Sequence, residues 1–62
     1  MSKKIIYVKE APGSVVSFYA PVSPDYYAGR ELVLQALTGW YCFKTVDRVY
    51  DQGNGWCRVF LE

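Results

Sequence analysis

Two cysteines and two aspartates in the C-terminal third are the side chains of this chain best suited to chemistry. Cys42 or Cys57 would act as a nucleophile only if a neighbouring base or cation lowered the pKa of its thiol. Asp47 and Asp51 lie four positions apart, which on one face of a strand separates their carboxyl groups by roughly 13 Å. That separation is wide for two carboxylates that share one reaction. We therefore interpret the cysteines as reduced core thiols and the aspartates as solvated strand charges.

The groups on which most enzymes and metal sites rely are missing. The sequence contains no histidine, which is the usual general base and a common metal ligand. Two cysteines without a histidine do not form a zinc site. Gly53 and Gly55 flank one residue in a turn and are not followed by a helix start, unlike the glycines of a phosphate-binding loop. We predict a non-enzymatic protein that holds no cofactor and no metal.

Length and composition predict one small domain over residues 1–62 with more apolar surface than it can bury. A chain of 62 residues buries only about 60% of the surface that it exposes when unfolded. This chain is 52% hydrophobic and carries eleven aromatic side chains, namely six Tyr, three Phe and two Trp. A core of this size cannot enclose all of them, so we expect either a homodimer or a face that binds a partner.

Charge and hydropathy exclude several classes of protein. The net charge of +1 comes from seven basic and six acidic residues that are well mixed, which argues against an acidic DNA mimic or a polybasic tail. The N-terminal apolar run, Ile5–Val8, is too short for a signal peptide or a membrane span. We expect a protein that works in the cytoplasm, that of the host cell for a virus- or plasmid-encoded chain, and that has no membrane partner.

The last third of the chain, residues 40–62, predicts a β-hairpin. Asn54-Gly55 is the strongest short-range hairpin signal, because a type I′ turn needs positive φ at both central residues. The preferred register makes three favourable cross-strand pairs, which are Asp51–Arg58, Tyr50–Val59 and Val49–Phe60. A four-residue loop is the alternative, and it would place Val49 across from Arg58.

The first two thirds predict two strands and a helix. Lys4–Lys9 and Ser14–Ala20 are rich in β-branched and aromatic residues, and the Pro-Gly turn between them favours a hairpin. Ser23-Pro24-Asp25 supplies the N-cap serine, N1 proline and first-turn acid of a helix start. Apolar residues at helical spacing extend that helix to Leu37, with Gly39 as its C-terminal cap.

These elements predict an α+β fold in the order β-β-α-β-β, with one helix packed on one face of a small antiparallel sheet. Glu31–Leu37 also fits a strand, and the alternative is then an all-β, SH3-like small barrel. The segment Asn54–Val59 resembles the Asn-Gly-Trp hairpin of bacterial SH3-type repeats over those six residues. That resemblance implies the second architecture.

The surplus of aromatic side chains favours a protein-binding module, because Trp, Tyr and Arg dominate the energetics of protein interfaces. The hypothesis is a small inhibitor of the kind that phages and plasmids encode, which binds a host enzyme or defence complex and occludes its functional surface. An exposed edge of the first or second strand is another candidate, since a partner strand can pair with such an edge. The predicted protein-binding residues are Tyr26, Tyr27, Trp40, Tyr41, Trp56, Arg58 and Phe60.

The alternative function is nucleic-acid binding by an aromatic and basic sheet face, which can stack bases. The segment Gly55–Phe60 resembles the RNP1 pattern of RNA-recognition sheets but lacks its leading basic residue and its second glycine or alanine. The near-neutral net charge ranks this function second. The predicted nucleic-acid-binding residues are Lys44, Arg48 and Arg58.

Overall fold

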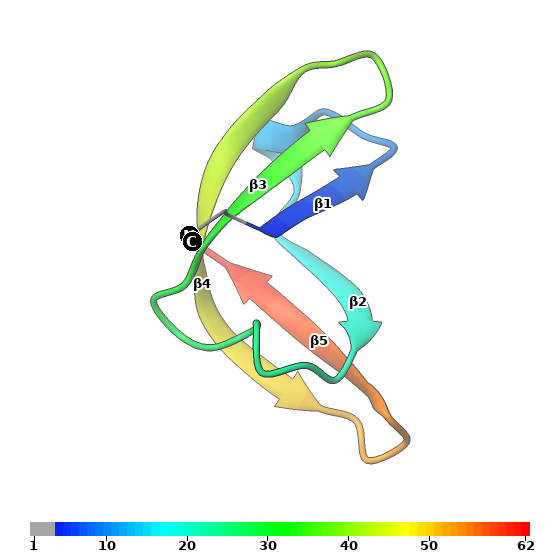
Figure 1. Ribbon diagram of the computed structural model, residues 1–62, viewed down its shortest axis with the longest axis vertical. Helices are drawn as coiled ribbons and strands as arrows, with labels where there is room; N and C mark the ends of the chain where they lie inside the picture. The colour runs from blue at the N-terminus through cyan, green and yellow to red at the C-terminus, as the bar shows by residue number, and fades with distance from the viewer. Residues whose placement is uncertain (1–3) are drawn as a thin grey trace.

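A computed structural model describes residues 4–62 and shows one sheet of five strands (Figure 1). The elements are β1 (Lys4–Val8), the short 3-10 helix η1 (Pro12–Ser14), β2 (Ser17–Pro21), β3 (Glu31–Ala36), β4 (Tyr41–Asp51) and β5 (Trp56–Leu61). Their order across the sheet is β1-β3-β4-β5-β2, so the two N-terminal strands form its opposite edges. The long strand β4 joins two halves, because β3 pairs along its first part and β5 along its second.

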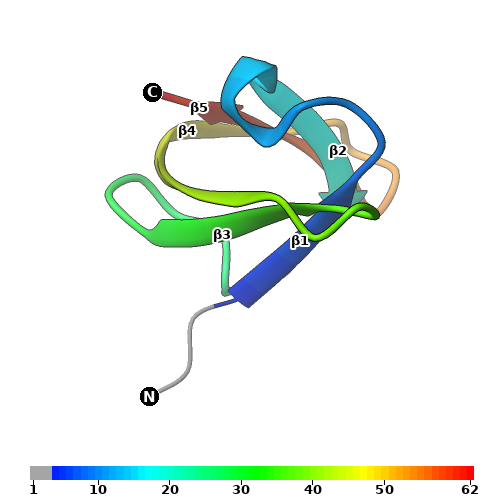
Figure 2. The same ribbon diagram turned by 90° about the horizontal axis from the view of Figure 1, so that it is seen from above.

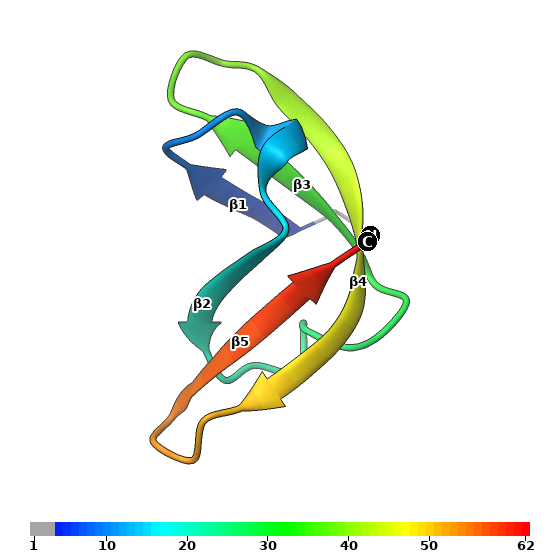
Figure 3. The ribbon, with the colours of Figure 1, turned by 180° about the vertical axis from the view of Figure 1, so that it is seen from behind.

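The sheet curls into a half-barrel around one core. Seen from above, the β1–β3 part of the sheet faces the β5–β2 part across the interior (Figure 2). From behind, η1 lies over the upper half, against β3 and β4 (Figure 3). The core holds Val15, Leu32, Leu34, Val46, Cys57, Val59 and Leu61. No aromatic side chain among residues 4–62 is fully buried, which confirms the expected surplus.

The α+β prediction is wrong, because the segment predicted as a helix forms turns and then strand β3. The N-cap signal acts only locally: the N–H of Asp25 donates to Ser23 Oγ at 3.1 Å, and the N–H of Tyr26 donates to the Ser23 carbonyl at 3.2 Å. Gly29 then takes a φ of +92°, far from helical values. From Glu31 onward the side chains alternate between surface and core, so burial with period two overrides the helical spacing. The architecture agrees with the all-β alternative.

Gly39 serves a hairpin and not the predicted helix cap. The N–H of Ala36 donates to the Trp40 carbonyl at 2.7 Å, and the N–H of Gly39 donates to the Ala36 carbonyl at 2.9 Å. These bonds close a three-residue loop between β3 and β4. Gly39 has a φ of +101°, and loops of this length need such a residue at their last position.

The predicted hairpin between the first two strands does not form. β1 pairs with β3 in parallel, and β2 pairs with β5 in antiparallel orientation. The connection between β1 and β2 passes along the inside of the sheet, where Val15 enters the core. β2 begins at Ser17 and not at the predicted Ser14, because Pro12–Ser14 is helical.

The C-terminal hairpin is present, but both registers considered for it are wrong by one residue. Asp51 lies opposite Cys57, and Arg58 lies opposite Tyr50. A shift of one residue moves every partner to the other face of the sheet, so Asp51 and Arg58 point to opposite sides. The predicted Asp51–Arg58 pair therefore does not form.

The loop of this hairpin explains the error. It has three residues, Gly53–Gly55, and its positive φ values fall on Gly53 (+83°) and Gly55 (+88°) and not on Asn54. Side chains support that geometry: Asp51 Oδ1 accepts from the N–H of Gly53 at 2.8 Å, and Asn54 Oδ1 accepts from the N–H of Trp56 at 3.1 Å. These short-range bonds favour the wider loop over a type I′ turn.

An extra residue in β4 changes the alternation of the strand halfway along its length. Val46 pairs with Leu61 and Arg48 pairs with Phe60, so Asp47 is the additional residue of a β-bulge. Before the bulge the even-numbered side chains face the core, and after it the odd-numbered side chains do. The bulge therefore sets which residues each half of β4 shows to the outside.

Candidate interaction faces

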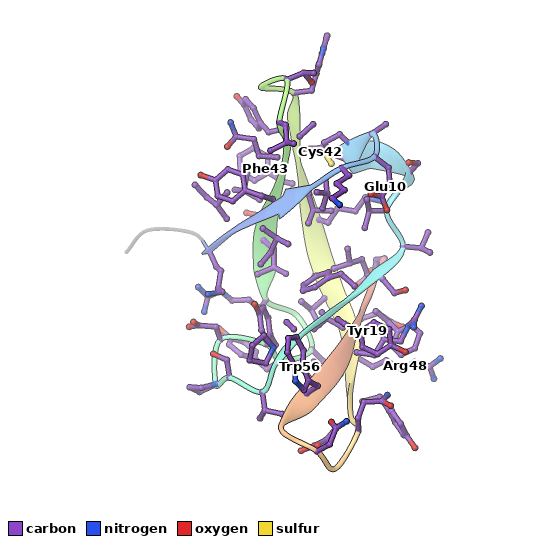
Figure 4. All side chains as sticks on the ribbon, turned by 90° about the vertical axis from the view of Figure 1, so that its right-hand side faces the viewer. Glu10, Tyr19, Cys42, Phe43, Arg48 and Trp56 are labelled. Atoms are coloured by element: carbon purple, nitrogen blue, oxygen red, sulfur yellow. The ribbon has the colours of Figure 1, made fainter. Side chains whose placement is uncertain are left out.

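The outer side of β2, β5 and the second part of β4 carries two arginines among four aromatic rings. Cross-strand neighbours form the rows Ser17–Phe60–Arg48 and Tyr19–Arg58–Tyr50, and Trp56 lies opposite Pro21 near the hairpin loop. We call this surface the arginine face, and its members are Tyr19, Arg48, Tyr50, Trp56, Arg58 and Phe60. Figure 4 shows Tyr19, Arg48 and Trp56 in the lower half of the molecule.

Both arginines stack on rings of this face. The guanidinium carbon of Arg58 lies 4.6 Å from the ring centroid of Tyr19, and that of Arg48 lies 4.7 Å from the centroid of Phe60. Arg58 Nη2 also donates to Ser17 Oγ at 3.0 Å. These contacts restrict the guanidinium groups before any partner arrives, which lowers the entropy that binding would cost.

The positive charge of this face is not neutralised within residues 4–62. Asp25, in the connection that leads to β3, forms ion pairs with Lys4 at 3.7 Å and with Arg30 at 3.8 Å. Neither Arg48 nor Arg58 pairs with a described carboxylate. The arginine face is thus locally basic in a chain whose net charge is only +1.

The outer side of β1, β3 and the first part of β4 carries a mostly apolar patch without a charged side chain. Strand registers align its residues in the rows Ile5–Val33–Phe43 and Tyr7–Gln35–Tyr41. We call this surface the neutral face, and its members are Ile5, Tyr7, Val33, Gln35, Tyr41 and Phe43. The rings of Tyr41 and Phe43 meet edge to face with centroids 6.0 Å apart. Glu31, opposite Thr45, lies in the next row and borders the face.

The structure brings three of the seven predicted protein-binding residues together. Trp56, Arg58 and Phe60 follow one another along the outer side of β5, on the arginine face. Tyr41 belongs to the neutral face, and Trp40 is exposed in the adjoining β3–β4 turn. The predicted set is therefore divided between two surfaces.

Tyr26 and Tyr27 lie in the connection between β2 and β3. Tyr26 packs against the core, with its ring edge-on to Phe18 at 5.7 Å and the Lys4 ammonium 5.7 Å from its centroid. Tyr27 is exposed, and the Arg30 guanidinium lies 5.8 Å from its ring. Tyr26 is thus a packing residue, whereas Tyr27 is open to a partner.

The three predicted nucleic-acid-binding residues do not gather at one place. Arg48 and Arg58 share the arginine face. Lys44 lies opposite Leu32 on the core side of β4, where its ammonium donates to the Gly13 carbonyl at 3.1 Å. One of the three cations therefore points away from the other two.

Tyr19 and Tyr50, which flank Arg58, were not predicted as site residues. The wrong hairpin register placed Tyr50 on the same side as Cys57. Tyr19 was assigned to a hairpin with the first strand, although β2 pairs with β5. The alternation within β2 is visible in the sequence, but it does not identify the strand with which β2 pairs.

A groove of about 480 Å³ lies between the β1–β2 connection and the β3–β4 turn. Its walls include Pro12, Leu37, Trp40, Tyr41 and Cys42. In Figure 4, Cys42 and Glu10 lie at the level of η1, in the upper half of the molecule. The groove is mostly apolar and adjoins the neutral face through Tyr41, so it offers room for an apolar side chain.

Two partly or fully buried titratable groups are shifted toward their neutral forms. Burial raises the pKa of the Cys57 thiol, and the charge of Asp51 adds to the rise, which works against a reactive thiolate. Burial also raises the pKa of Tyr26, with smaller contributions from Cys57 and Asp25. Within residues 4–62 no cluster of metal-ligating side chains is arranged to hold an ion. Over the same range, no helix has the length and apolar character that crossing a bilayer requires.

Comparison of the chain with protein-family models, curated proteins and solved structures finds no match. The chemistry of the two faces is therefore the basis on which a function can be inferred.

Proposed function

We propose that this protein is a non-catalytic binding module whose arginine face covers an acidic surface of a protein partner. The observation that carries the proposal is the line of Trp56, Arg58 and Phe60 along β5, flanked by Tyr19 and Tyr50. Tryptophan, tyrosine and arginine are the residues whose truncation costs most at protein interfaces. On this surface they lie side by side on strands, so their positions are fixed by the sheet.

The charge of the face defines the partner. Arg48 and Arg58 stack on rings but leave donors that no described carboxylate occupies. A carboxylate-rich surface would accept those donors in charge-assisted hydrogen bonds while the rings cover its apolar parts. The mode of action we propose is occlusion, as in a phage- or plasmid-type inhibitor of a host enzyme or defence complex, acting in the host cytoplasm.

The face is a better candidate than the sheet edges. β1 and β2 are the edge strands, as a strand-pairing partner would require. However, β1 begins at Lys4 and is followed by Lys9, and β2 ends at Pro21. Lysine and proline are the residues with which proteins block pairing at an edge.

The proposal is tested by comparing partner capture by the unmodified chain with capture by a variant that lacks the rings of Trp56 and Phe60. Tagged protein is used to capture partners from nuclease-treated host lysate, and affinity for the retained protein is then measured. Trp56→Ala combined with Phe60→Ala should abolish binding while the circular dichroism spectrum is kept. The matched control is Trp40→Ala with Tyr27→Ala, which removes one Trp and one other ring outside both faces. Unchanged affinity in the folded Trp56/Phe60 variant would exclude the arginine face as the site.

Binding of single-stranded nucleic acid is the second candidate, and the stacked pair Arg48 and Arg58 favours it. Rings beside unpaired guanidinium groups suit bases and phosphates as well as carboxylates. The position of Lys44 on the core side removes one predicted phosphate contact. Salt separates the two functions: affinity for an oligonucleotide should fall steeply with salt, and Arg48→Gln should lower that slope by about one. A ring-anchored protein interface should show a much shallower dependence.

A further inference from the structure

We propose that the neutral face is covered by a second copy of this chain, in a twofold dimer that packs the β1–β3–β4 half of one sheet against that of the other. The inference goes beyond the proposed function, because it concerns the outer surface of the other half of the sheet and a different partner. It starts from the rows Ile5–Val33–Phe43 and Tyr7–Gln35–Tyr41, whose six side chains carry no charge.

The neutral face exposes a large apolar area to water. Tyr7 is 67% exposed, Tyr41 is 60% exposed and Phe43 is 53% exposed. Since an aromatic side chain buries about 150–250 Å² when enclosed, these three rings alone leave roughly 350 Å² of one copy in water. Contiguous apolar patches of a few hundred Å² on a soluble protein mark sites of association.

A dimer of this face would have a small interface, of the size found in weakly associating complexes. Two copies would bury roughly 700 Å² from the three rings of each. Ile5, Val33 and Gln35 lie between or beside those rings and add to this area. The total comes to about 1,000 Å², the lower bound for a specific protein interface. Two sheet faces can meet in this way at a spacing of about 10 Å.

Charge identifies the occupant as a second copy. In a twofold interface each residue near the axis meets its own equivalent, so a charge there is repelled by an identical charge. The neutral face avoids this penalty, since Glu31 lies only at its border. The arginine face does not, because Arg58 occupies the middle row between Tyr19 and Tyr50 and would meet a second Arg58. Of the two faces, only the neutral one is therefore suited to self-association.

The size of the chain adds a reason for association. Domains of about 60 residues are marginally stable alone, and oligomerisation is a common remedy. None of the aromatic side chains among residues 4–62 is fully buried, so the core is built from smaller aliphatic side chains and Cys57. Burial of Tyr7, Tyr41 and Phe43 between two copies would add to the aromatic packing that Phe18 and Tyr26 supply in the monomer.

Sedimentation velocity over protein concentrations from about 1 µM to about 1 mM tests the proposal. The unmodified chain should shift from monomer to dimer as concentration rises. Phe43→Arg places two like charges in the interface and should raise the dimer dissociation constant at least about 100-fold. Tyr50→Arg is the matched control, because Tyr50 is a similarly exposed ring on β4 but belongs to the arginine face. This control should leave the dissociation constant within about threefold of the original.

Three results would overturn the inference. These are a chain that stays monomeric at the highest concentration, a dimer that survives Phe43→Arg, and a dimer that Tyr50→Arg disrupts instead. Circular dichroism checks that each variant is folded. If Phe43→Arg fails to fold, Tyr7→Arg on the edge strand β1 replaces it, with the same expected loss of dimer. A partner captured through the arginine face bears only on the proposed function, so the two can fail independently.

Discussion

The two outer faces of this half-barrel are alike in their strands and exposed rings and differ in their charge. Each consists of three neighbouring strands, each shows exposed rings, and β4 contributes to both. The neutral face has no charged member, whereas the arginine face places Arg48 and Arg58 among its rings. In the two proposals above, exposed aromatic area is the feature that both faces share, and the charge within this area is the feature that would select the kind of partner.

The largest effect is expected from a substitution in the core that supports both faces, because it should destabilise the whole fold. Leu34 is fully buried behind the neutral face, in the same cluster as Val59 behind the arginine face. Leu34→Ala should reduce the free energy of unfolding by about 2–5 kcal/mol, because it removes buried methyl groups and leaves a cavity. Denaturant titration measures the loss. The control, Leu37→Ala at an exposed turn position, should change stability by less than about 0.5 kcal/mol.

A substitution at Arg58 should weaken partner binding by the arginine face and leave the neutral face unchanged. Arg58→Ala removes a guanidinium held by Tyr19 and Ser17, and should weaken partner binding by about 2 kcal/mol or more. Calorimetry with the captured partner measures the change. Arg58→Lys keeps the charge but not the planar stacking group, so it should recover only part of the affinity. Equal losses for Arg58→Ala and Tyr41→Ala would show that the two faces do not act separately.

The alkylation rates of the two cysteines compare how readily the two halves of the sheet open to solvent. Cys42 lies on the core side of the neutral half and is partly exposed, whereas Cys57 is buried behind the arginine half with its thiol pKa raised by burial. An alkylating reagent near neutral pH should therefore label Cys42 at least about tenfold faster than Cys57. Mass spectrometry of Cys42→Ala and Cys57→Ala variants gives each rate alone. Equal rates would mean that the arginine half opens as readily as the neutral half.

The smallest effect is expected at alkaline pH, through Tyr26. Its folded-state pKa is raised, mainly by burial, so the folded chain retains the phenol proton at pH values where the unfolded chain has lost it. The corresponding stability is fully present below about pH 10, the usual pKa of tyrosine, and is lost as pH rises through the folded-state pKa. Denaturant midpoints measured above pH 10 should fall less in Tyr26→Phe, which keeps the ring beside Phe18 but cannot ionise.

Local signals predicted part of this molecule well. The period-two pattern and the glycine-containing turn located the C-terminal hairpin, and they placed Trp56, Arg58 and Phe60 on one face of β5. The helix prediction failed because Glu31–Ala36 has a pattern that satisfies both periods, and only burial between β1 and β4 decides in favour of a strand. Local sequence cannot supply that information.

The site was predicted less completely than the fold elements, for a related reason. Tyr19 joins Arg58 only because β2 pairs with β5, which lies about forty positions later in the chain. The neutral face likewise depends on the parallel pairing of β1 with β3, which places Ile5 beside Val33. Long-range strand pairing thus created both faces, and no motif in the sequence encodes it.

Asp47 is one additional residue in β4, and because of it the outward-facing positions are odd-numbered before the bulge and even-numbered after it. Replacing Asp47 by another polar residue keeps the count of positions, so Arg48 and Tyr50 still point outward. Deleting it would make Val46 and Arg48 consecutive in a ladder without a bulge, where they keep Leu61 and Phe60 as partners, so Arg48 and Tyr50 would still point outward. The contribution of position 47 is therefore the local bend and twist that a bulge gives to β4. We expect substitutions there to be tolerated, and we expect deletion of residue 47 to keep the arginine face while removing the local bend of β4.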